Sequence, residues 1–180
     1  MSFEIIDNGI QVGLFLLFAL FSLIQGLHMQ NRRFLILAGT YASFSMGTLY
    51  YLLYLVIMGK VPQVFYVSEM AWMASYLFLL ALCLMETRRY RGKLDVWVLG
   101  LTIVEAAMVI GWKILGPSYP FTIVFALVTA CIFYYALLGY RMEKRMLMLA
   151  MVLVIVWQLL LYIVSVFTTG YTHFNLYFAV

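Results

Sequence analysis

Residues 9–28, "GIQVGLFLLFALFSLIQGLH", contain no aspartate, glutamate, lysine or arginine. An α-helix of about 20 mainly apolar residues crosses the hydrocarbon core of a bilayer, so this run predicts a transmembrane helix. The preceding flank, "MSFEIIDNG", is acidic, and no small-residue cleavage site follows the run. Both features argue against a secretory signal peptide.

The composition of the whole chain supports the same interpretation. Of its 180 residues 67% are hydrophobic and only 10% are charged, whereas about a quarter of the residues in a soluble domain are charged. We therefore predict an all-α, polytopic helical bundle that forms a single integral membrane domain over residues 1–180. Six transmembrane helices are expected, at about 9–28, 34–58, 64–85, 94–115, 121–141 and 146–168.

The basic residues predict the orientation of this bundle. Nine of them follow the first, third and fifth spans, and two lie on the other side, at Lys60 and Lys113. The nine are Arg32, Arg33, Arg88, Arg89, Arg91, Lys93, Arg141, Lys144 and Arg145. The positive-inside rule then places these turns in the cytoplasm and the amino terminus outside. We expect a multi-pass protein of a cell membrane, of the bacterial inner-membrane kind, and no nucleic-acid partner.

The tail 170–180, "GYTHFNLYFAV", leaves three alternatives open. It is apolar enough to begin a seventh helix but too short to cross a bilayer. It is an outer tail, a re-entrant or interfacial segment, or the start of a truncated helix.

Small side chains recur every four residues in the second span, at Gly39, Ser43 and Gly47. Such a stripe lets another helix approach closely. It predicts packing inside the bundle, with a homo-oligomer contact as the alternative.

One carboxyl group interrupts the fourth span, at Glu105 in "LTIVEAAMV", residues 101–109. An ionised acid at the bilayer centre costs a few kcal/mol, so we expect a largely neutral carboxyl that faces the bundle interior. The alternative is a carboxyl that faces a water-filled cavity. The expected partners are polar side chains at similar depth, and helical spacing places four residues of its own span on the same side. The partners are Gln158, Ser75, Tyr76, Ser45, Thr48 and Thr129, and the same-side residues are Thr102, Met108, Val109 and Trp112. A ligand-binding or coupling role competes with a structural hydrogen bond.

A second group of candidate ligand-binding residues lies in the third span. Glu69 is expected to be an acid in the first helical turn, after a possible cap at Ser68, where the helix dipole favours it. The alternative is an outward-facing ligand cup, because Glu69, Trp72 and Tyr76 share one helix face. Trp157 joins the candidates because it falls near the centre of the sixth span, away from the interfaces where tryptophan is enriched.

Enzyme signatures are missing from the sequence. The two cysteines, Cys83 and Cys131, form no CxxC pair, and the two histidines, His28 and His173, fall at opposite faces of the predicted membrane. We therefore predict no catalytic residue, no metal site and no cofactor.

The third span, "VSEMAWMASYLFLLAL" at 67–82, is followed by an arginine-rich turn. Together with the outer amino terminus and the short basic turns, it resembles the multi-helix sensor modules that precede histidine kinases and diguanylate cyclases in bacteria. Those modules have seven or eight helices and an output domain, whereas this chain predicts six and no output domain. No site residue is carried over from the resemblance.

These features favour a sensor or receptor that binds a small or lipophilic ligand among its helices and signals to another protein. The alternative is a small-solute or ion transporter that uses Glu105 as a protonatable coupling group. A membrane enzyme acting on lipid comes third, so a non-enzymatic role is favoured. The expected partners are membrane lipid, a small molecule and a signalling protein.

Overall fold

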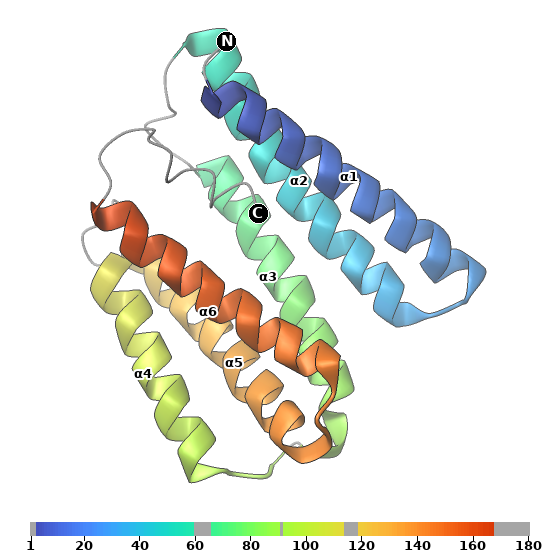
Figure 1. Ribbon diagram of the computed structural model, residues 1–180, viewed down its shortest axis with the longest axis vertical. Helices are drawn as coiled ribbons and strands as arrows, with labels where there is room; N and C mark the ends of the chain where they lie inside the picture. The colour runs from blue at the N-terminus through green and yellow to red at the C-terminus, as the bar shows by residue number, and fades with distance from the viewer. Residues whose placement is uncertain (1–2, 60–65, 91, 114–118, 168–180) are drawn as a thin grey trace. The chain divides into compact units, whose positions relative to one another are not determined.

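The computed structural model describes residues 3–59, 66–90, 92–113 and 119–167. Over these residues the protein is all-helical and has no strand, as predicted (Figure 1). Six α-helices and one 3-10 helix follow in order: α1 (Phe3–His28), α2 (Arg32–Met58), α3 (Tyr66–Glu86), η1 (Arg88–Tyr90), α4 (Val96–Lys113), α5 (Tyr119–Glu143) and α6 (Met146–Phe167). The tail 170–180, with its three alternatives, lies outside the described residues.

Four of the helices are long and apolar enough to cross a membrane. They are α1, α2, α3 and α5, whose apolar segments run over Glu4–His28, Arg32–Met58, Val67–Glu86 and Phe121–Glu143. In α4 and α6 the apolar segments are shorter, at Val96–Gly111 and Met146–Leu161. The structure is therefore compatible with a multi-pass membrane protein.

The distribution of side chains on α1 suits a lipid surround. Its buried residues are small or polar, such as Asp7, Ala19 and Ser22, whereas Leu17 and Phe21 are exposed. A water-soluble helix buries its large apolar residues and exposes its polar ones. The reverse arrangement on α1 fits a helix whose outer face meets hydrocarbon.

Two compact units make up the chain, and each is described by itself. The first unit holds α1, α2 and α3 as far as Leu79, and the second holds the remainder of α3 from Leu80, then η1, α4, α5 and α6. The single-domain organisation over 1–180 stays a prediction.

In the first unit, α1 and α2 lie side by side (Figure 1). Long-range side-chain hydrogen bonds join them. Ser45 Oγ donates to the Val12 carbonyl at 3.1 Å, and the Tyr51 hydroxyl donates to Glu4 Oε1 at 2.8 Å. The turn between the helices ends at Asn31, whose Oδ1 caps α2 by accepting from the Arg33 N–H at 3.1 Å.

The glycines of α2 lie against side chains of α3. A Cβ atom built on Gly47 would lie 2.7 Å from Trp72 Nε1, and one built on Gly39 would lie 2.9 Å from Phe78 Cε1. These distances are shorter than any normal carbon contact, so only glycine permits the approach. The contacts favour packing within the unit as the role of this stripe, and the homo-oligomer contact through Gly39, Ser43 and Gly47 stays a prediction.

In the second unit, α5 packs against both α4 and α6 (Figure 1). It is buried on several sides, with Ala126, Ile132 and Leu138 almost completely covered. The end of α3 belongs to the same unit and is fully buried at Leu82 and Cys83. The Cys83 thiol lies 3.7 Å from the Ile132 carbonyl of α5.

The start of α4 is fixed by Asp95. Its Oδ1 accepts from the N–H groups of Trp97 and Val98, at 3.1 and 3.3 Å, and its Oδ2 accepts from Arg141 Nη1 at 2.6 Å. We expect Asp95→Ala to cost about 1 kcal/mol of stability, because it removes the cap as well as the ion pair. Asp95→Asn keeps a capping oxygen, so its cost should be smaller. Thermal unfolding in detergent, followed by circular dichroism, compares the two variants. Equal stabilities would show that the cap contributes nothing.

Candidate functional site

Glu105 lies on the one buried stripe of α4 that the described residues show. The buried members are Val98, Thr102, Glu105 and Val109, spaced by four, three and four residues. Such spacing keeps all four on one face of the helix. Met108, predicted on the same side, is 37% exposed, and the side chain of Trp112 lies outside the described part of the chain.

The Glu105 carboxyl is enclosed but has no hydrogen-bond partner in the part of the chain that the structure describes. The residue is only 5% exposed, and neither carboxyl oxygen forms a hydrogen bond with any described residue. Thr129 of α5 interacts with the carboxyl, but its hydroxyl donates instead to the Ala126 carbonyl at 3.2 Å. In the same way, the Thr102 hydroxyl donates to the Val98 carbonyl at 2.8 Å. By these distances, both hydroxyls donate to the backbone of their own helices and not to the carboxyl.

An enclosed acceptor without a donor is unusual. Most buried polar side-chain atoms in folded proteins have a hydrogen-bond partner, and leaving one without a partner costs about 1–3 kcal/mol. No described lysine, arginine or histidine forms an ion pair with Glu105. The carboxyl oxygens therefore have unused hydrogen-bonding capacity among the described residues.

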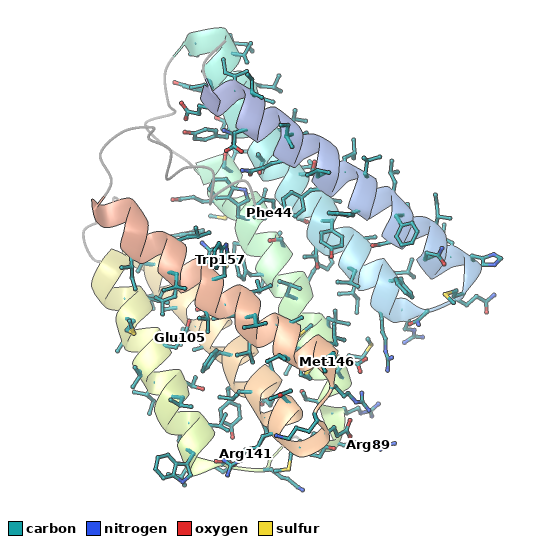
Figure 2. The ribbon with its side chains drawn as sticks, viewed as in Figure 1. Phe44, Arg89, Glu105, Arg141, Met146 and Trp157 are labelled. Atoms are coloured by element: carbon teal, nitrogen blue, oxygen red, sulfur yellow. The ribbon has the colours of Figure 1, made fainter. Side chains whose placement is uncertain are left out.

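Gln158 and Trp157 of α6 belong to the same unit as Glu105. The buried stripe of α6 runs through Met148, Met151 and Ile155, and Gln158, three residues further on, is half-buried on the same face. Trp157 is 43% exposed and lies off that stripe. Figure 2 shows Glu105 on α4 and Trp157 on α6. No hydrogen bond joins Glu105 to Gln158.

The other candidate residues lie on α3 in the first unit. Tyr76 is buried, whereas Glu69 and Trp72 are half-buried. The indole Nε1 of Trp72 and the hydroxyl of Ser68 are both covered, and neither has a hydrogen-bond partner among the described residues. The six candidates thus divide equally between the two units.

The residues predicted to form a polar layer around Glu105 come from both units. Ser45, Thr48 and Ser75 lie in the first unit, where each hydroxyl donates to a backbone carbonyl. The acceptors are Val12 at 3.1 Å, Phe44 at 3.2 Å and Trp72 at 2.7 Å. Thr129 and Gln158 are the predicted partners that share the unit of Glu105.

A charged cluster at one end of the second unit was not anticipated from the sequence. Arg141 pairs with Asp95 at 2.6 Å, and Arg145 pairs with Glu86 at 2.8 Å and also with Glu143. Figure 2 shows Arg89 and Arg141 at this end. The sequence does contain a signal for this cluster, namely the acids that lie close to the basic residues of the two turns. A count of positive charges alone ignores these acids.

Tyr90 of η1 joins the same cluster. Its hydroxyl donates to Glu143, and this hydrogen bond raises the pKa of the Tyr90 hydroxyl above its ordinary value. The stability that the bond contributes is present while the tyrosine is neutral and is lost as the pH rises above about 10, where tyrosine ionises. The contact ties η1 to α5.

Among the residues that the structure describes, no three His, Cys, Asp or Glu side chains converge as a metal site would require. Cys83 is buried and Cys131 is exposed, and both are free thiols.

Comparisons with protein-family models, with curated proteins and with solved structures find no match.

Proposed function

We propose that this chain is an integral membrane protein of the sensor or receptor type, which binds a small or lipophilic ligand among its helices. The observation that carries the proposal is the enclosed carboxyl of Glu105, whose two oxygens have no hydrogen-bond donor among the described residues. A ligand with an amine or hydroxyl group would supply those donors and would bind more tightly than its hydrocarbon analogue. The signal passes to another protein through a change in helix packing, as the resemblance to bacterial sensor modules implies.

The proposal includes a topology of six spans with the amino terminus outside, in a membrane of the bacterial inner-membrane kind. Four long apolar helices support the membrane location. Within the second unit, Arg89 and Arg141 lie at the same end (Figure 2), and the positive-inside rule places such an end in the cytoplasm.

A binding experiment with three related probes tests the sensor proposal. The purified protein in detergent is heated alone and with 1-aminoadamantane, 1-adamantanol or adamantane. We expect the amine and the alcohol to raise the unfolding temperature and adamantane to leave it unchanged, because only the first two donate hydrogen bonds. The shift should disappear in Glu105→Gln, which replaces half of the acceptor with a donor, and persist in Glu69→Gln. An equal shift in both variants, or an equal shift with adamantane, contradicts the proposal.

A proton- or ion-coupled transporter is the second candidate, because the same carboxyl can gain and lose a proton without a competing cation of the chain. Proteoliposomes with an entrapped pH-sensitive dye test it. We expect this candidate to show a proton flux in the wild type that Glu105→Gln abolishes. A Glu105→Gln protein with normal flux removes the transporter, and absence of flux in the wild type favours the sensor.

A further inference from the structure

The short helix η1 holds two adjacent arginines on a fixed backbone. Thr87, just before it, is buried, its N–H donates to the Cys83 carbonyl at 2.9 Å, and its hydroxyl donates to the same carbonyl at 2.7 Å. At the other end, the Tyr90 N–H donates to the Thr87 carbonyl at 2.8 Å and the Tyr90 hydroxyl donates to Glu143. The backbone of Arg88 and Arg89 is thus anchored on both sides.

Both arginine side chains are exposed and neither forms an ion pair with a described residue. The acids of this end are already engaged, since Asp95 pairs with Arg141 and both Glu86 and Glu143 pair with Arg145. Positive charge therefore remains in excess at η1. Because the backbone is held in place, less conformational entropy is lost when the two guanidinium groups bind an anion.

Exposed apolar side chains follow this pair of arginines in the chain. Leu94, Val96 and Trp97 precede or open α4, and they are 73%, 74% and 78% exposed. A phospholipid presents the matching chemistry, with a phosphate group next to glycerol and acyl chains. Arginine binds phosphate oxygens with two parallel N–H donors, and tryptophan is enriched at the level of lipid headgroups.

We propose that Arg88 and Arg89 form a binding site for the phosphate group of an anionic phospholipid, with the exposed start of α4 against its acyl region. An acidic protein surface would match the two charges but would gain less from the exposed apolar side chains. A free phosphate ion would gain nothing from them. We therefore identify the ligand as a lipid. This proposal does not depend on the function proposed for Glu105.

Native mass spectrometry of the detergent-solubilised full chain tests the site. The protein is incubated with phosphatidylglycerol or with phosphatidylcholine, and the bound lipids are counted. The test variant is Arg88→Gln/Arg89→Gln, and the control is Arg32→Gln/Arg33→Gln, which makes the same change of charge at the start of α2. We expect the wild type to retain phosphatidylglycerol preferentially. The test variant should lose about thirtyfold in apparent affinity, because two juxtamembrane cations are removed, whereas the control should lose much less.

Three results overturn the proposal. Equal losses in the two variants show general attraction to the basic surface, without a discrete site. Equal retention of the two lipids by the wild type shows that the protein does not prefer the anionic lipid. An acidic protein surface would then be the better candidate for the ligand. Displacement of the lipid by inorganic phosphate at similar concentration shows that the acyl region contributes nothing. Unchanged circular dichroism of the test variant, expected because both side chains are exposed, ties a lost affinity to the arginines.

Discussion

Gly47→Ala is expected to destabilise the first unit by about 1–3 kcal/mol, the usual cost of forcing extra volume into a packed core. The added Cβ atom would lie 2.7 Å from Trp72 Nε1 and 3.0 Å from the backbone carbonyl oxygen of Ser68. The indole ring is rigid and the carbonyl belongs to α3, so the clash cannot be relieved by rotating the end of a flexible side chain. Either α3 moves away from α2 or the ring leaves its place.

Gly13→Ala provides the matched control for this prediction. A Cβ atom on Gly13 of α1 has no neighbour within 4 Å, so this variant should be unchanged or gain up to about 1 kcal/mol from the better helix propensity of alanine. Unfolding in mixed detergent and dodecyl sulfate, followed by tryptophan fluorescence, measures both variants. The emission of Trp72 should also shift in Gly47→Ala. Equal unfolding curves for the two variants would contradict the close packing of α2 on α3.

Glu105→Leu is expected to stabilise the second unit by about 1–3 kcal/mol, because it removes a buried polar group that has no partner. Glu105→Gln should change stability little, since a buried amide requires hydrogen-bond partners much as a buried carboxyl does. Thr102→Val is the control. It lies on the same buried stripe, but its hydroxyl donates to a carbonyl of its own helix, so its loss should cost little.

The same unfolding assay separates two roles of the carboxyl. If Glu105→Leu unfolds more easily than the wild type, the carboxyl forms a structural hydrogen bond. If Glu105→Leu is more stable and also loses the response to 1-aminoadamantane, the carboxyl is kept at a cost in stability for binding.

The helices could be predicted because length and apolar character set them almost alone. The observed helix bounds differ from the predicted spans where polar groups form hydrogen bonds within the protein. The helix α1 begins at Phe3, ahead of the predicted span, because Glu4 accepts from Tyr51 and Asn8 donates to the Glu4 carbonyl. The predicted end of the second span, at 58, coincides with the end of α2, where Gly59 adopts a left-handed conformation with φ of 65°.

The partners of Glu105 could not be predicted from depth alone. A hydroxyl in a helix can donate to a carbonyl three or four residues earlier, and this local choice competes with any contact across the bundle. Thr102 and Thr129 both donate to carbonyls of their own helices. Although they lie at a similar depth to Glu105, neither hydroxyl donates to its carboxyl. The charged cluster of the second unit was missed for a different reason, since the positive-inside rule disregards where acids lie.

The narrow buried stripe of α4 has a mechanical consequence. This helix is fastened to its unit along Val98, Thr102, Glu105 and Val109, whereas α5 is enclosed on several sides. A change of protonation or of occupant at Glu105 alters one of these few points of attachment, and α5 offers no comparable weak point. If Glu105 binds a proton or a ligand as proposed, the position of α4 in its unit is expected to respond more than that of α5.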